Sequence, residues 1–309
     1  SNRLNITASS FLVGYKIGLV NEAVLNGTVI LILITCLVSS FITENAGRKL
    51  AIIENEQLPP AEEGNEKILV PVSNPQTIEY LMDFAIMLHD RRQAQPIYAL
   101  SIVNDNNEAR ERVRMSNKMM EKVLIHAAAT DSKVKIITRV DLNVVSGIAR
   151  TVTELMATNI IIGWSRRATA ADRLFGNLFG SALNNIIQHV WQNVFLCHFI
   201  NPLNTTRKMI IMATQNAEYE FGFSLWVNKV MKLSGEAGAR IQLYCSEKTF
   251  AAFEREMGKT KSSLEINFNH FENIEDFFLL SRNITKDDLL VVVGARKGTL
   301  SYHSYIDSL

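Results

Sequence analysis

The chain has 309 residues, enough for two domains of ordinary size, and 32 basic and 31 acidic residues leave a net charge of +1. This balance shows no basic surface, so no nucleic-acid partner is expected. The three cysteines, at 36, 197 and 245, lie far apart, which favours a reducing compartment over a disulfide framework or a metal site.

The first predicted element is an apolar helix over residues 24–42, which lies between Glu22 and Glu44 and carries no charge. An apolar helix of about 20 residues spans the hydrocarbon of a bilayer, so this stretch is interpreted as a membrane span. A buried core helix of a soluble protein is the alternative. Arg48 and Lys49 follow the run, and by the positive-inside rule they place residues from about 45 onward in the cytoplasm.

An acidic segment over residues 54–66 contains a Pro-Pro step and no apolar period, which predicts a linker. Short apolar runs then alternate with amphipathic stretches. Strands are predicted at 68–72, 97–103, 134–140, 159–163 and 194–200, and helices at 75–90, 107–130, 144–157 and 181–189. This alternation predicts a parallel sheet covered on both faces.

The same order of elements then restarts. Strands are predicted at 208–214, 239–244, 264–270 and 288–294, and helices at 219–233 and 274–281. A tandem α/β repeat is the economical interpretation, with a first domain over 67–203 and a second over 204–309. The second copy ends before a counterpart of the strand at 194–200, so it is either truncated or completed by another chain.

Three short motifs carry a family resemblance: Lys67-Ile-Leu-Val-Pro-Val72, Asn159-Ile-Ile-Ile-Gly163 and the pair Gly180-Ser181 before a helix. Together they resemble the universal stress protein domain. The resemblance implies two tandem Rossmann-like parallel-sheet repeats, of the adenine nucleotide alpha hydrolase-like type, preceded by one apolar helix. It also implies a site for ATP or another adenine nucleotide, because the family's nucleotide-binding branch has an Asp after the first strand and a glycine loop after the fourth.

Glycines in such a loop let main-chain amides approach phosphates, and the following helix N-terminus adds its positive end. Ser73 stands where the family has Asp, and Arg166 stands at the loop's second glycine. The candidate nucleotide or anion positions are Val72, Ser73, Gly163, Arg166, Gly180 and Ser181 in the first repeat and Gly294 and Gly298 in the second. The basic residues Arg166, Arg167, Arg296 and Lys297 are candidates to attract the anion.

Residues 18–44 resemble the last membrane helix of monovalent cation:proton antiporters of the sodium/proton exchanger type, some of which carry universal-stress-like domains after that helix. Residues 293–302 also resemble such tails. The resemblance implies that residues 1–53 end a membrane domain in the inner or plasma membrane, with an upstream transport domain as partner and a homodimer as the assembly. The chain is then expected to be the cytoplasmic regulatory C-terminal region of the antiporter, which does not transport by itself.

A soluble nucleotide-binding sensor of the universal stress protein type is the alternative function, in which residues 24–42 form a core or dimerisation helix. An enzyme that hydrolyses ATP is a third option, but the sequence offers no catalytic base and no metal-binding carboxylate beside the loop. No enzymatic activity is therefore expected.

Overall fold

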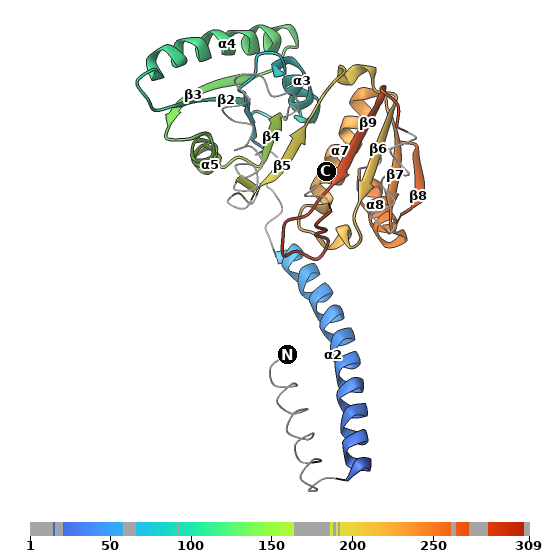
Figure 1. Cartoon of the computed structure of the whole chain (residues 1–309). Coiled ribbons are helices and arrows are strands. Elements are labelled where there is room, and N and C mark those ends of the chain that lie inside the picture. The colour runs from blue at the N-terminus through green and yellow to red at the C-terminus, as the bar shows by residue number, and fades with distance from the viewer. Residues whose placement is uncertain are drawn as a thin grey trace. The chain divides into compact units, whose positions relative to one another are not determined.

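A computed structural model describes residues 15, 21–57, 66–91, 93–163, 186–187, 190, 192–260, 264–271 and 284–305. The chain divides into two units, residues 1–58 and 59–309, which are described separately (Figure 1). The linker was predicted to begin at residue 54. Helix α2 continues to Gln57, so the first four residues of the predicted linker are helical. Glu and Gln favour helix formation, and prolines, which end helices, follow only at positions 59 and 60.

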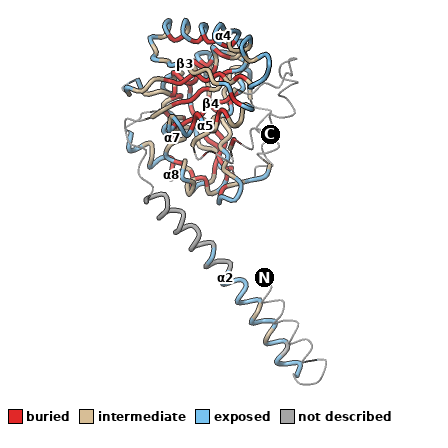
Figure 2. The backbone as a smooth tube through the Cα atoms, turned by 90° about the vertical axis from the view of Figure 1, so that its left-hand side faces the viewer, coloured by how far each residue is buried: buried red, intermediate tan, exposed pale blue. Residues whose placement is uncertain are grey.

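Helix α2 (Glu22–Gln57) contains the predicted apolar run. Its start is capped by Asn21, whose side-chain oxygen accepts a hydrogen bond from the Val24 amide at 3.0 Å. Its segment Glu22–Ser39 is long and apolar enough to cross a membrane, with a mean hydropathy of 2.0. Among the described residues of that segment none is buried, and the described residues of α2 are mostly exposed in Figure 2.

The first sheet is entirely parallel and has the strand order β3-β2-β1-β4-β5. Its strands are β1 (Ile68–Pro71), β2 (Ile97–Asn104), β3 (Val134–Asp141), β4 (Asn159–Gly163) and β5 (Asn193–Cys197). Its helices are α3 (Ile78–Leu88), α4 (Ala109–Ala129) and α5 (Val144–Leu155). Helices α3 and α4 cover one face and α5 the other (Figure 1).

Strand β1 shows why its sequence is a continuous apolar run. Val70 belongs to the core beneath α3 and α4, whereas Leu69 belongs to the core beneath α5. Both side chains are fully buried, as expected for a central strand of a sheet covered on both faces.

Strand β5 was predicted to reach Ile200 but ends at Cys197. Its neighbour β4 ends at Gly163, which is the register partner of Cys197, so the pairing of these two strands ends at that point. The predicted helix at 181–189 lies outside the described residues, apart from residues 186 and 187, which are helical.

The second sheet is also parallel, with the order β8-β7-β6-β9 among the described strands. Its strands are β6 (Lys208–Ala213), β7 (Arg240–Cys245), β8 (Ile266–His270) and β9 (Asp288–Val293). The 3-10 turns η1 (Leu203–Thr205) and η2 (Ala217–Tyr219) precede and follow β6, and helices α7 (Phe223–Ala237) and α8 (Glu247–Lys259) cover one face. The predicted helix at 274–281 lies outside the described residues.

Helix α8 was not predicted. It connects β7 to β8, as α4 connects β2 to β3, and thus completes the repeat of strand and helix order. Ser246 caps it by accepting a hydrogen bond from the Thr249 amide at 3.2 Å. Phe250 stacks on Phe268 at 4.3 Å between ring centroids, and Phe253 is fully buried. The high charge of this segment concealed its apolar face.

One hydrophobic core joins the two sheets. It contains side chains from α3 and β1 of the first sheet and from α7 and β6 of the second. Phe84 on α3 packs against Phe199, which precedes the second sheet, with ring centroids 5.3 Å apart. Helices α3 and α7 therefore lie side by side, and Figure 2 shows the buried chain concentrated around the strands.

Candidate functional site

The strand order locates one candidate ligand-binding edge in each sheet. In open parallel α/β sheets, ligands bind at the carboxyl ends of the two strands where the direction of winding reverses. These strands are β1 and β4 in the first sheet and β6 and β9 in the second. The residues that follow them include Val72, Ser73 and Gly163 in the first sheet and Thr214 and Gly294 in the second.

At the first edge, Val72 and Ser73 have different environments. Val72 is buried, and its amide donates to the Leu100 carbonyl at 2.7 Å, so it extends the pairing of β1 with β2. Ser73 is exposed. The following turn is held by Asn74, whose side chain accepts from the Gln76 amide at 2.9 Å. Ser73 is therefore the accessible one of the two candidates, with a hydroxyl where the family pattern has a carboxylate.

Gly163 has a packing role that its motif did not reveal. A Cβ atom at this position would lie 2.7 Å from Leu81 Cδ1 on α3. Cβ atoms do not approach other atoms this closely, so a larger residue would force the Leu81 side chain to shift, and glycine lets α3 pack over the end of β4 as it does. The remaining first-repeat candidates Arg166, Gly180 and Ser181 lie outside the described residues.

At the second edge, the chain itself occupies the carboxyl end of β6. The Thr214 hydroxyl donates to the Ser301 carbonyl at 2.9 Å, and the Ser301 amide donates to Glu220 Oε1 at 2.8 Å. Thr214 and Ser301 are both buried. Gly298 supplies the turn that leads into this segment: its φ of +94° favours glycine, and Thr299 N donates to Arg296 O at 3.1 Å across it.

Arg296 does not offer its guanidinium to an anion as the sequence suggested. Its Nε donates to the Ile187 carbonyl at 3.1 Å, and a terminal nitrogen donates to the Gln192 carbonyl at 2.7 Å. Burial lowers the pKa of this guanidinium. The side chain is committed to the main chain of the segment that precedes β5, whereas its neighbour Lys297 is exposed.

Two carboxylates beside the second edge were not identified from the sequence. Glu218 Oε2 accepts from the Thr249 hydroxyl at 2.7 Å, while its buried Oε1 has no hydrogen-bond partner among the described residues. Burial, and then the charge of Glu218, raise the pKa of Cys245 to about 12. Glu220 adds a second negative charge, which makes this edge unfavourable for a phosphate. In the sequence, the signal for these two carboxylates was their position shortly after a predicted strand.

The carboxyl ends of β2 and β3 in the first sheet carry polar groups that sequence reasoning also missed. Asn104 and Asp141 end β2 and β3 and are register partners. Asp141 accepts from the Ser146 hydroxyl at 2.7 Å, and this bond, followed by the Leu142 amide, lowers the pKa of its carboxyl. The buried Oδ1 of Asn104 has no hydrogen-bond partner among the described residues.

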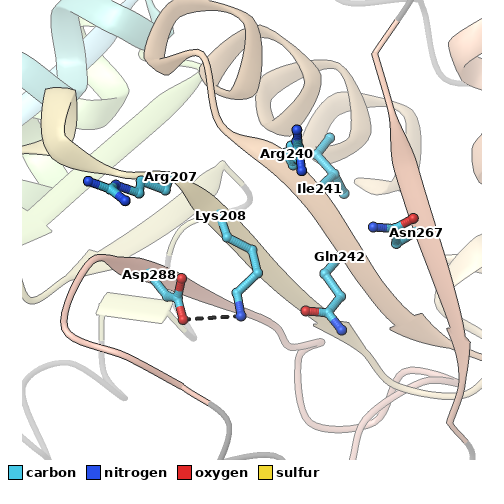
Figure 3. A pocket seen from close by; sticks show the side chains of 7 residues that line it. All are labelled: Arg207, Lys208, Arg240, Ile241, Gln242, Asn267 and Asp288. Carbon is cyan, nitrogen blue, oxygen red and sulfur yellow. Dashed lines mark ion pairs between the residues drawn. The ribbon is translucent and has the colours of Figure 1, made fainter.

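A cavity of about 460 Å³ lies at the opposite, amino end of the second sheet (Figure 3). It is lined by Arg207, Lys208, Arg240, Ile241, Gln242, Asn267 and Asp288. The Lys208 ammonium lies 3.2 Å from Asp288 Oδ2, and Gln242 Nε2 donates to the Tyr244 hydroxyl at 2.7 Å. Lys208 and Asp288 thus neutralise each other, and none of the predicted site residues lines the cavity.

Comparison with known proteins supports both resemblances. Residues 64–198 match the universal stress protein family. The chain is 29% identical over 189 residues to the Na+/H+ antiporter NhaS5 of a Synechocystis strain, which is 54% of this chain and 26% of that protein. The chain thus spans about a quarter of the length of that relative.

Solved structures match the fold. A universal stress protein from Archaeoglobus fulgidus aligns with a TM-score of 0.51 and 17% identity, over 77% of this chain and 88% of that chain. A second one from that organism, in complex with dAMP, aligns with a TM-score of 0.34 and 16% identity, over 42% of this chain and 96% of that chain. The first alignment is longer than either sheet with its helices and supports the same fold for both. The sequence match over residues 64–198 and this structural alignment agree that the chain shares the fold of universal stress proteins.

Proposed function

We propose that this chain is the cytoplasmic regulatory C-terminal region of a monovalent cation:proton antiporter. The observation that carries the proposal is the order of parts in one chain, a membrane-length apolar helix followed by a universal stress protein domain. The similarity to an Na+/H+ antiporter supports the same assignment. In this proposal the chain does not transport by itself, its partner is a transport domain upstream, and a homodimer is its assembly.

The chemistry of α2 suits a lipid environment. Four of its large apolar side chains, Ile30, Leu31, Leu33 and Ile34, are at least half exposed. The hydroxyl of Thr28 donates to the Val24 carbonyl at 2.8 Å and that of Thr35 to the Leu31 carbonyl at 2.9 Å, so the helix satisfies these polar groups internally. Internal satisfaction matters because hydrocarbon offers no hydrogen-bond partners.

An adenine nucleotide is the ligand we assign to the regulatory region, at the carboxyl edge of the first sheet. That edge carries the exposed hydroxyl of Ser73, and the carboxyl end of the neighbouring strand β2 carries Asn104. The corresponding edge of the second sheet is filled by Ser301 and bordered by Glu218 and Glu220. The first sheet thus supplies the ligand site, and the second is its structural partner.

Exchange measurements test the regulatory role. Cation:proton exchange would be measured in inverted vesicles containing the transporter with and without residues 67–309. We expect removal of these residues to change the rate, its pH dependence or the apparent ion affinity, because a regulatory region must shift the equilibrium between transporter states. Identical values of all three quantities would reject the regulatory role.

Carbonate extraction and protease protection in cells test the location. A membrane-spanning α2 keeps the chain in the carbonate-resistant fraction, with residues 59–309 digested only when the cytoplasmic side is accessible. Recovery of the chain in the soluble fraction would instead support the alternative, a soluble nucleotide-binding sensor of the universal stress protein type.

Light scattering of the purified chain tests the homodimer, which a monomeric mass would exclude.

Calorimetry of the full chain in detergent with ATP, ADP and AMP tests the ligand separately. Ser73→Trp should abolish the binding heat by filling the mouth of the first edge. Gln215→Trp, at an exposed position beside the second edge, is the matched control and should leave the heat unchanged. Absence of heat in the native chain would remove the nucleotide and leave the antiporter assignment intact.

A further inference from the structure

Two lysines of α7 bind the carboxyl end of α3, at the junction between the two sheets. Lys229 Nζ donates to the Leu88 carbonyl at 3.0 Å, and Lys232 Nζ donates to the His89 carbonyl. These acceptors lie at the helix end that carries partial negative charge, where ammonium groups are favourable. The lysines therefore hold together helices that belong to different sheets (Figure 1).

Glu66 completes this junction. It forms an ion pair with Lys229, and the two side chains are only 12% and 13% exposed. Glu66 Oε1 also accepts from Asn159 Nδ2 at 2.6 Å, so the carboxylate is fixed to the start of β4. Removal of water makes charge interactions here stronger than on an open surface. A change of charge at the junction would consequently be felt by both sheets.

His89 also lies at this junction, and histidine is the side chain whose ordinary pKa lies closest to neutral pH. Its Nε2 lies 2.9 Å from the Gln95 carbonyl oxygen, which only accepts, so Nε2 carries the hydrogen and the neutral ring leaves Nδ1 unprotonated. Adding a proton would therefore place a third cation near Lys229 and Lys232. Among the described residues, the negative charge of Glu66 opposes this repulsion at His89. The negative charges of Asp90 and Glu236 favour the charged form of Lys232.

We propose that His89 makes the junction between α3 and α7 acid-sensitive, so that protonation of its ring loosens the contact between the two sheets. The ring is about half buried, and burial is the main cause that lowers the pKa of His89 below its ordinary value of 6.5. The neutral ring's contribution to stability is thus fully present above pH 6.5 and is lost as the pH falls through the lower folded-state pKa. This inference does not depend on the antiporter assignment.

Hydrogen–deuterium exchange of the full chain in detergent tests the proposal. Exchange would be followed from pH 7.5 to 5.5, corrected for the intrinsic rate, in peptides that cover residues 84–90 and 226–236. Protection in both peptides should fall on acidification, by at most about tenfold per pH unit because one proton is involved. His89→Gln keeps a donor for the Gln95 carbonyl but cannot become charged, so it should lose this pH response.

His126→Gln is the matched control, because His126 Nε2 pairs with Asp83 at 2.6 Å between α3 and α4, away from α7. It should retain the native response in the α7 peptide. Lys232→Met removes one neighbouring cation and should shift the midpoint of the acid response to higher pH. The proposal is overturned if the native chain shows no response, if His89→Gln responds like the native chain, or if Lys232→Met leaves the midpoint unchanged.

Discussion

Arg296 donates a hydrogen bond of 2.7 Å to the main-chain carbonyl of Gln192, 104 residues earlier in the chain. Gln192 precedes β5 of the first sheet, and Arg296 follows β9 of the second. A second bond from the same guanidinium, to the Ile187 carbonyl at 3.1 Å, strengthens the connection. The loop that the sequence marked as a phosphate cradle thus fastens one sheet to the other.

Replacing Arg296 tests this structural role. Arg296→Gln should lower the free energy of unfolding by about 1–3 kcal/mol, because at least one of the two carbonyls loses its charged donor. Lys297→Gln, at the exposed neighbouring position, should change it by less than about 0.5 kcal/mol. Urea unfolding followed by the fluorescence of Trp226, which packs against Phe223 in the second sheet's core, measures both. Equal stabilities of the two variants would contradict the role.

The packing of Gly163 gives a second prediction. Gly163→Ala should destabilise the chain by about 1–3 kcal/mol, because the new methyl group would lie 2.7 Å from Leu81 Cδ1. Gly235→Ala is the matched control: it lies in α7 with nothing within 4 Å, so it should be neutral or stabilising. Leu81→Ala removes the atom that the new methyl group would meet. In that background, Gly163→Ala should lower the free energy of unfolding by less than it does in the native chain. An undiminished cost would mean that the contact is not the cause.

The sequence predicted most of the fold because hydrophobic burial in a two-sided parallel sheet produces long apolar runs. Strands such as β1 and β4 have no exposed face and were recognisable within one residue. Helix α8 was missed because charged residues surround the few apolar side chains of its buried face, which are Phe250, Ala252, Phe253 and Met257. The end of β5 could not be predicted, since it depends on where its partner β4 stops.

The candidate site was less predictable. The strand order brings Ser73 and Gly163 together, and from the sequence only the family resemblance placed both in one site. The packing role of Gly163 depends on Leu81, and the occupation of the second edge depends on Ser301, which lies 87 residues after Thr214. Such contacts are set by tertiary structure and leave no local pattern in the chain.

Cys245 predicts a dependence of stability on alkaline pH. Its folded-state pKa is about 12, against an ordinary value of 9.0, so the folded chain holds the neutral thiol. Stability should therefore be intact below pH 9 and decline as the pH rises toward 12, by up to about 1.4 kcal/mol per pH unit for one group. Cys245→Val should have a flatter profile between pH 9 and 11 in urea unfolding. Cys36→Val, at an exposed position, should keep the native slope.

Helix α2 gives the prediction on which the membrane assignment depends. Ile34 lies within its apolar segment and is 50% exposed. Ile34→Arg should weaken membrane insertion by about 3 kcal/mol, because an arginine near the centre of a spanning helix carries that penalty. Carbonate extraction should then release a larger share of the chain. Ile125→Arg, 71% exposed on α4, is the matched control and should leave extraction unchanged, since α4 is outside the span.

If both variants stay as firmly in the membrane as the native chain, α2 is not what holds it there. If the native chain is extracted as readily as Ile34→Arg, the helix lies on a protein surface instead of in lipid.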